Sequence, residues 1–272
     1  MKYLIAILLL VSGQSWASDI KIISYGPKSG PTTNLGTLVS KELTSNPNVI
    51  ATGDCQEAAR QFNSEKSVIG VIGHASVVKG QTVGKKCPLP FDQKVVFAVT
   101  GYYSVCHMKN HNGQLTATSR ISIPAVFPSK KFVDEFNQDN QAKLRVINVP
   151  GGGEAMASLL SGDVDFTLLP HFSAVKSEAE GQITCRSLNP QDHTYLGKQY
   201  KIRSEPFYFM VFIVTKGLNT EQNADIVKAL RSRDVQAWLN ATAWKNAIIE
   251  PSNKDMDNIN RVIESHRQLY LQ

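Results

Sequence analysis

Three consecutive glycines, Gly151 to Gly153, form the stretch of this sequence best suited to binding chemistry. Pro150 and an apolar segment precede them, a helix-like stretch from Glu154 to Leu160 follows, and a second apolar run, Val164 to Leu169, comes after Gly162. This order predicts a parallel β-α-β unit in which Gly162 takes the left-handed turn that ends the helix. Glycines let a backbone approach a ligand closely, and the first N–H groups of a helix have no internal partner. The loop is therefore expected to hold an anionic group.

The spacing of this loop argues against a nucleotide. The run from Pro150 to Glu154 contains neither the G-x-G-x-x-G pattern that holds a dinucleotide pyrophosphate nor the Gly-Lys-Ser/Thr ending of a P-loop. We therefore expect no nucleotide and no other cofactor.

A second glycine-containing loop stands near the start of the chain. Ile20 to Tyr25 is a short apolar strand, and the residues from Gly26 to Thr33 lead into a helix predicted over Asn34 to Leu43, where the apolar residues have helical spacing. At least one polar side chain among Thr32, Thr33 and Asn34 is expected to cap that helix. The others are free to hydrogen-bond a ligand.

His74 follows an almost continuous apolar run, Val68 to Gly73, which is typical of a strand buried on both faces of a parallel sheet. Open α/β sheets bind ligands at the carboxyl ends of such strands, so His74 and the nearby Ser76 are candidate contacts. A lone histidine serves equally well as a structural hydrogen-bonding residue, and the sequence leaves both interpretations open.

No catalytic or metal-binding set emerges from the motifs. The chain has no G-x-S-x-G elbow, no H-E-x-x-H and no carboxylate-histidine cluster at metal spacing. Its six histidines are widely separated and would meet only through the fold. We expect no metal site and no enzymatic activity.

The first 17 residues have the pattern of a cleavable signal peptide. Lys2 gives a positive start, Tyr3 to Val11 is a short apolar segment, and Ser15 to Ala17 ends in a small residue at the cleavage position. The apolar run is shorter than the roughly 20 residues that span a bilayer, and no Cys follows the cleavage position. The mature chain is expected to begin at Ser18 and to be exported in soluble form.

Four cysteines in an exported chain are expected to form two structural disulfides. Three pairings are possible. The order of strands and helices favours Cys55 with Cys87 in one half of the molecule, and Cys106 with Cys185 where the chain crosses to the other half.

The charge pattern gives no nucleic-acid surface. The formal net charge is +6, but Lys and Arg are dispersed, and their tight groups are not interleaved with aromatic residues. We expect a solvated basic surface with a mild attraction for small anions. No long exposed apolar helix or edge strand is evident, so we expect a monomer.

Strands and helices alternate along most of the chain. Two strands are predicted from Lys94 to Thr100 and from Tyr102 to His107, with Gly101 between them, and Pro206 to Thr215 is predicted as a central strand. The apolar stripe of Asp255 to Tyr270 predicts a helix packed on the core.

Both glycine loops resemble those of one family. Tyr25-Gly-Pro-Lys-Ser-Gly-Pro-Thr-Thr-Asn-Leu35 is similar to the first ligand loop of type 2 periplasmic solute-binding proteins, especially the Bug-type receptors of tripartite tricarboxylate transporters. Val149-Pro-Gly-Gly-Gly-Glu-Ala-Met-Ala-Ser-Leu-Leu-Ser-Gly-Asp-Val-Asp165 is similar to their second loop, helix and strand. The resemblance covers nearly the whole chain. The sequence departs from the Bug pattern at Asn34, where Asp is usual, in lacking an Arg in the helix that follows, and in its paired cysteines.

The resemblance implies an α/β fold of the two-lobed type 2 periplasmic binding protein kind, in which each lobe is a mostly parallel sheet flanked by helices and crossing hinge strands join the lobes. After a signal peptide at 1–17, lobe 1 would comprise 18–104 and 191–272, and lobe 2 would comprise 105–190. A small organic anion would lie in the cleft, held by backbone amides of both loops. The candidate ligand-binding residues are Tyr25, Lys28, Ser29, Gly30, Thr32, Thr33, His74, Ser76, Gly151, Gly152, Gly153, Glu154 and His171.

The function implied is that of a periplasmic receptor which captures a small anion, such as a carboxylate, and delivers it to membrane transporter subunits. A periplasmic enzyme on the same fold is the first alternative, and it would need an acid-base pair in the cleft, for which His74 and His171 are the candidates. A ligand-binding subunit of a membrane sensor is the second.

Overall fold

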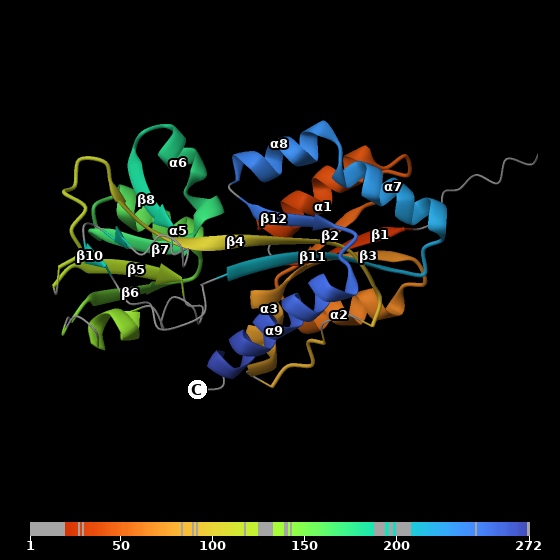
Figure 1. Ribbon diagram of the computed structural model, residues 1–272, viewed down its shortest axis with the longest axis horizontal. Coiled ribbons are helices and arrows are strands. Elements are labelled where there is room, and N and C mark those ends of the chain that lie inside the picture. Colours follow the sequence, from red (N-terminus) through yellow and green to blue (C-terminus); the bar gives the residue numbers. More distant parts are fainter. Residues whose placement is uncertain are drawn as a thin grey trace, which may run out of the picture.

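The structure, a computed structural model, describes most of the chain after residue 19 (Figure 1). The described residues are 20–26, 28, 30–82, 84–88, 90, 92–116, 118–124, 133–138, 141, 143–187, 194–195, 198–199, 208–242 and 244–270. The predicted signal peptide, 1–17, and Ser29 lie outside them. Within the described part, no helix is both long and apolar enough to cross a membrane.

The first lobe is built on a mixed sheet with the strand order β2-β1-β3-β11-β4, to which β12 adds by pairing with β4. The first three strands are parallel, whereas β11 is antiparallel to both of its neighbours. Every residue of β3 is buried, as expected for a strand covered on both faces. These strands are β1 (Lys21–Tyr25), β2 (Val49–Thr52), β3 (Val68–Gly73), β4 (Lys94–Met108), β11 (Tyr208–Lys216) and β12 (Lys245–Ile249).

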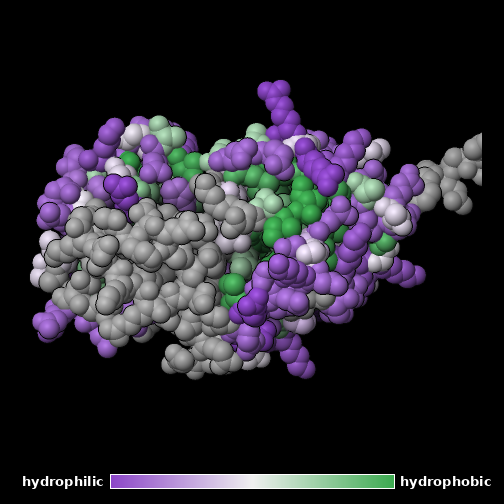
Figure 2. Space-filling view, viewed as in Figure 1, coloured by the Kyte–Doolittle hydropathy of each residue, from purple (hydrophilic) through white to green (hydrophobic). Residues whose placement is uncertain are grey.

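Helices cover both faces of this sheet (Figure 1). One apolar cluster joins the sheet to α1 (Pro31–Glu42), α7 (Thr220–Leu230) and α8 (Arg233–Ala241). A second cluster joins its other face to α2 (Cys55–Ser64), α3 (His74–Thr82) and α9 (Asn253–Tyr270). Figure 2 shows apolar residues reaching the surface of this lobe between α8 and α9.

The second lobe repeats the plan on a smaller scale. Its sheet has parallel strands β6, β5 and β7, and β4 pairs antiparallel with both β7 and β8. Helix α5 packs on one face, and the helical residues 133–138 pack on the other. The elements are β5 (Arg120–Pro124), β6 (Arg145–Val149), α5 (Gly152–Leu160), β7 (Phe166–Pro170), η1 (His171–Ser173), α6 (Val175–Ala179) and β8 (Ile183–Ser187), and a separate pair comprises β9 (Thr194–Tyr195) and β10 (Lys198–Gln199).

The two-lobed fold is as predicted, but the sheets are mixed instead of mostly parallel. The reason in the first lobe is β11, which runs antiparallel to β3 and β4, and in the second lobe it is the crossing strand β4, which runs antiparallel to β7. The partner of β4 changes between Tyr102, which pairs with Tyr208 of β11, and Tyr103, which pairs with Pro170 of β7. The predicted lobe boundaries stay a prediction.

The prediction of two strands separated by Gly101 is wrong, because β4 runs unbroken through that residue. Gly101 pairs with Phe209 of β11, so the ladder continues across it. Its lack of a side chain makes room for the Trp244 ring, which a Cβ at position 101 would approach to 2.9 Å. The glycine is therefore a packing site and not a turn.

Both predicted disulfides are present. Cys55 bonds Cys87 with an S–S distance of 1.98 Å, and Cys106 bonds Cys185 with an S–S distance of 2.06 Å. The first ties the start of α2 to the segment that follows α3. The second joins paired residues of β4 and β8.

Candidate functional site

A cavity of about 470 Å³ lies between the two lobes. All six parallel strands, three from each sheet, direct their carboxyl ends toward it, which is where α/β sheets bind ligands. It is lined by Tyr25, Gly26, Pro31, Thr32, Gly53, Asp54, Cys55, Ala75, Ser76, Gly80, Lys85, Tyr103, Pro124, Pro150, Gly151, Gly152, Pro170 and Phe172.

Four helices begin at the wall of this cavity: α1, α2, α3 and α5. The N-cap residues of α1 and α5 are Gly30 and Gly151, and neither helix has a side-chain cap. Helix α5 therefore offers the N–H of Gly152 to a ligand, whereas α1 begins with Pro31, which has no N–H, and offers that of Thr32 from the other lobe. Helix α2 differs, because the Asp54 side chain accepts hydrogen bonds from the backbone N–H groups of Gln56 and Glu57.

Helix α1 begins earlier in the chain than the sequence predicts. The helix begins at Pro31, a residue favoured in the first helical position, and its N-cap is Gly30. The predicted side-chain cap among residues 32–34 is therefore wrong. Instead, the Ser24 hydroxyl donates to Thr32 Oγ1 at 2.9 Å and lies 2.8 Å from Thr33 Oγ1. Both threonine hydroxyls thus help to join α1 to β1.

The candidate residues of the first loop fall into two groups. Tyr25 and Thr32 line the cavity, whereas Lys28 is exposed and is not part of the lining. Gly26 also lines it, and a Cβ at that position would lie 2.3 Å from Thr32 Oγ1. A side chain at position 26 would therefore displace the Thr32 hydroxyl.

In the second loop, Gly151 and Gly152 line the cavity, whereas the exposed Gly153 and Glu154 do not. A Cβ at Gly152 would lie 2.6 Å from the hydroxyl of Ser173, so a side chain at this position would displace Ser173. A Cβ at Gly153 would meet no atom within 4 Å. None of the three glycines has a positive φ, whereas Gly162 has the predicted left-handed turn at φ +80°.

His74 is buried outside the cavity lining, and its Nδ1 accepts a hydrogen bond from the Met210 backbone N–H at 2.9 Å. This hydrogen bond joins the start of α3 to β11, and a ligand contact from His74 stays a prediction. Ser76, two residues later, does line the cavity.

His171 also has structural partners. Its Nδ1 lies 2.8 Å from the Ser104 hydroxyl, and its Nε2 lies 3.6 Å from a Glu178 carboxylate oxygen. This order of serine, histidine and carboxylate resembles a hydrolase triad, but Ser104 is fully buried and cannot meet a substrate. His171, Glu178 and Cys185 also come close enough to surround a metal ion, but the Cys185 sulfur is already in a disulfide.

Two tyrosines line the cavity, and the sequence pointed to only one of them. Tyr25 ends β1 and Tyr103 lies within β4, and both are at least 98% buried. Burial raises the pKa of both phenols, so the hydroxyls stay protonated. Within the described residues neither hydroxyl has a hydrogen-bond partner, so both are available as donors.

Three further residues of the lining, Asp54, Lys85 and Phe172, are not among the candidates predicted from the sequence. Asp54 stands at the carboxyl end of β2 and caps α2, a position that the strand-end rule would have found. Lys85 reaches the wall from the segment after α3, and nothing local marks it. Phe172 stacks on Trp244 of the first lobe, with ring centres 5.4 Å apart and planes 11° apart.

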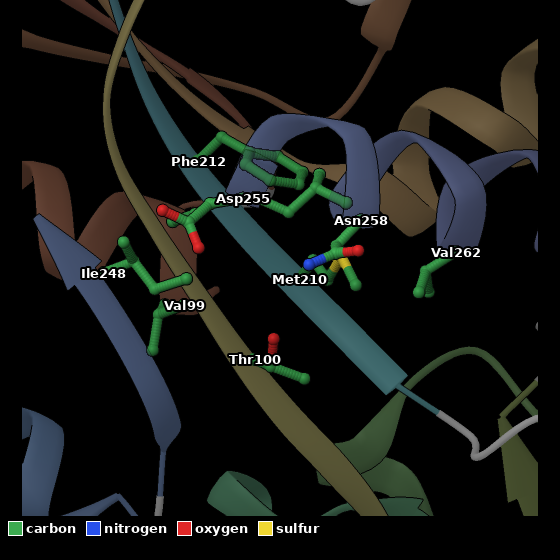
Figure 3. A pocket seen from close by; sticks show the side chains of 10 residues that line it. Val99, Thr100, Met210, Phe212, Ile248, Asp255, Asn258 and Val262 are labelled. Atoms are coloured by element: carbon green, nitrogen blue, oxygen red, sulfur yellow. The ribbon is translucent and has the colours of Figure 1, made fainter. Parts of the chain in front are cut away.

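Two other cavities are less suited to an anion. One of about 190 Å³ lies between α9 and strands β4, β11 and β12 (Figure 3), and its charged residue is Asp255. Another of about 580 Å³ lies at the amino ends of β1 and β3, where Glu221 and Asp225 line a mainly apolar surface. Neither lining contains a Lys or Arg. The cleft between the lobes is therefore the best candidate site.

Searches with the sequence found no matching protein-family model and no matching curated protein. Solved structures do match in fold. A TctC solute binding protein from Polaromonas aligns at TM-score 0.61 with 12% identity, over 93% of this chain and 96% of that one.

The chain has the two-lobed fold of periplasmic solute-binding proteins. MatC from Rhodopseudomonas palustris with bound malate aligns at TM-score 0.62 and 13% identity, over 93% of this chain and 97% of that one. An R. palustris protein with adipate aligns at TM-score 0.60 and 13% identity, over 94% and 97%. At these identities the likeness is one of fold, and TctC and Bug-type receptors are among the proteins that share it.

Proposed function

We propose that this protein is an exported receptor that captures a small organic anion, a carboxylate, in the cleft and delivers it to a membrane transporter. The observation that carries the proposal is the pair of helix starts without a side-chain cap, α1 at Pro31 and Thr32 and α5 at Gly151 and Gly152, in the wall of one cavity. Unpaired N–H groups and the positive helix ends favour a negative ligand group without a cationic side chain. The hydroxyls of Tyr25 and Tyr103 add neutral donors.

The ligands named for two structures of the same fold, malate and adipate, support a small organic acid as the ligand class. We further propose that residues 1–17 direct export to the periplasm, and that the lobes divide at 18–104 with 191–272 and at 105–190. The protein would act as a monomer, with transporter subunits as its partners. We propose binding without catalysis, because neither His74 nor His171, the candidates for an acid-base pair, is part of the described cavity lining.

Native mass spectrometry of freshly purified protein tests this function. We expect a bound species whose mass is that of a small organic acid, released intact when the protein unfolds. The released acid should raise the melting temperature when it is added back. Incubation of the acid with the protein should leave its mass unchanged, and appearance of a product would favour an enzyme instead. If no small carboxylate either co-purifies or raises the melting temperature, the proposal is wrong.

A further inference from the structure

The cavity between the lobes contains one ion pair, and it lies on the wall formed by the first lobe. Among the described residues that line the cavity, Asp54 and Lys85 are the charged ones, and Lys85 Nζ contacts Asp54 Oδ2. Both side chains keep more than two fifths of their surface exposed. The wall therefore offers a donor and an acceptor side by side, with a net charge of zero.

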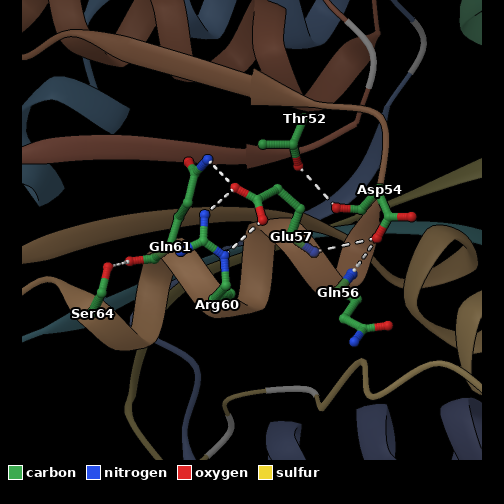
Figure 4. Close-up of polar contacts among 7 residues, drawn as sticks. All are labelled: Thr52, Asp54, Gln56, Glu57, Arg60, Gln61 and Ser64. Atoms are coloured by element: carbon green, nitrogen blue, oxygen red, sulfur yellow. Dashed lines mark hydrogen bonds and ion pairs between the residues drawn. The ribbon is translucent and has the colours of Figure 1, made fainter.

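Asp54 is held in place by α2 (Figure 4). Its Oδ1 accepts from the backbone N–H groups of Gln56 at 2.8 Å and Glu57 at 3.2 Å, which leaves Oδ2 to meet Lys85. The hydrogen bond from Lys85, together with those two N–H groups, holds the pKa of Asp54 below its ordinary value. The carboxylate is therefore ionised at neutral pH.

Lys85 is held by its own backbone and by a disulfide. Its backbone N–H donates to the Gly80 carbonyl at 2.9 Å, and Cys87, two residues later, is bonded to Cys55 beside Asp54. Gly80 packs against that disulfide, since a Cβ there would lie 2.1 Å from Cys55 Sγ. The Asp54 carboxylate and the backbone of Lys85 are thus held next to each other, and the ion pair joins their side chains.

The helix starts around the cavity differ in whether a side chain of the protein caps them. Those of α1 and α5 have no side-chain cap, whereas that of α2 is occupied by Asp54, which is a carboxylate of the protein itself. A second ligand carboxylate at this wall would meet the negative charge of Asp54, and Asp54 already neutralises Lys85. The start of α2, where a second anionic group of the ligand would bind, is therefore occupied by the Asp54 carboxylate.

We infer that the cleft selects a monocarboxylate whose far end is an uncharged group with an adjacent donor and acceptor, such as a carboxamide, over a dicarboxylate. The inference rests on the proposed function, which places the carboxylate at the starts of α1 and α5. The carboxamide oxygen then accepts from Lys85, which has donors beyond the one that Asp54 uses. The carboxamide N–H donates to Asp54 Oδ2. A carboxylate has the same shape but no donor for Asp54.

Matched acids that differ only in this group test the inference. The probes are succinate and succinamate, glutarate and glutaramate, and adipate and adipamate, with affinity measured by calorimetry and by the shift in melting temperature. We expect the unmodified protein to bind the monoamide at least about tenfold more tightly than the diacid of the same length, because the diacid adds a charge beside Asp54.

Two variants of the ion pair should shift this preference in opposite directions. Asp54→Asn keeps a good N-cap residue for α2 but leaves Lys85 without its counter-charge, so diacid affinity should rise by roughly tenfold. Lys85→Gln leaves Asp54 alone, so the preference for the monoamide should grow. If either residue had a merely structural role, its substitution would weaken the binding of both ligands alike.

Glu57→Gln is the matched control, since Glu57 carries its charge on α2 outside the cavity lining and pairs with Arg60 (Figure 4).

The outcomes separate this inference from the proposed function. If diacids bind the unmodified protein as well as monoamides do, or if Asp54→Asn leaves the preference unchanged, the inference is wrong and the receptor function stands. If none of the six acids and no other small carboxylate binds, both are wrong. Opposite shifts in Asp54→Asn and Lys85→Gln, with Glu57→Gln unchanged, support the inference.

Discussion

Gly152 and Gly153 are neighbours at the start of α5, yet their surroundings differ. Gly152 lines the cavity and packs against Ser173, whereas Gly153 is exposed with no atom near the position of a Cβ. Neither has a positive φ, so backbone freedom is not the reason for either glycine. At the residue scale, the requirement for glycine is therefore one of space, and it applies to Gly152.

Gly152→Val should disrupt ligand binding much more than Gly153→Ala. A side chain at 152 must displace Ser173 or the loop, and overpacking of this kind costs about 1–3 kcal/mol. We therefore expect the affinity for the co-purifying acid to fall by roughly tenfold or more, and Gly153→Ala to stay within about twofold. Calorimetry on both variants, with circular dichroism to check folding, is the measurement. Unchanged affinity in Gly152→Val would show that the loop is only a turn.

At the scale of elements, β5 and β7 are joined where both strands begin. The Arg120 guanidinium lies 2.9 Å from Asp165 Oδ1, and the Arg120 backbone N–H donates to Asp165 Oδ2 at 2.8 Å. This contact fixes the start of β5 against the residue that precedes β7. The hydrogen bond from the Arg120 side chain holds the pKa of Asp165 below its ordinary value of 3.8.

Asp165→Asn should destabilise the protein at neutral pH and not in acid. Because the folded-state pKa of Asp165 is lowered, its contribution is complete above about pH 4 and is lost as the pH falls through the folded-state value. The pair is partly exposed, so we expect a loss of about 0.5–1 kcal/mol in the free energy of unfolding at pH 7. Urea unfolding at pH 7 and pH 3 measures it. The control is Asp163→Asn, which removes an exposed carboxylate that accepts a hydrogen bond from Ser161. An equal loss of stability in Asp165→Asn at both pH values would contradict this account.

At the scale of the whole molecule, the described residues join the lobes through the strand β4 and an aromatic contact. Phe172, at the cavity wall of the second lobe, stacks on Trp244 of the first, and Trp238 lies 6.1 Å from Trp244 between ring centres. The two ligand loops stand on opposite lobes, so a ligand that contacts both makes a new connection between them. Such a ligand favours the closed arrangement.

Binding should compact the protein in solution. We expect the co-purifying acid to lower the radius of gyration in small-angle scattering and to raise the melting temperature as its concentration increases. Gly152→Val should need a roughly tenfold or higher concentration of the acid to show the same two effects. A rise in melting temperature with no compaction in the unmodified protein would mean that the acid contacts one lobe only. Light scattering at the mass of two chains would contradict a monomer.

Local sequence patterns determined most of the fold. The alternation of apolar runs with helical periodicity predicted β1, β3, α5, β7 and α9 close to their observed places, since those signals depend on neighbouring residues. The preferred disulfide pairing followed from the order of those elements. The unbroken β4 was missed because the local effect of Gly101 is outweighed by its pairing with Phe209 and its packing on Trp244.

The cavity wall was decided only by the tertiary structure. The sequence indicated both glycine loops, because a strand, glycines and a helix follow one another in the chain. It could not show that Lys28, His74, Gly153 and Glu154 lie off the lining, since that depends on which way each element faces. Nor could it show that Asp54 meets Lys85, 31 residues further along the chain, because that contact requires α2, α3 and the Cys55–Cys87 disulfide to pack together.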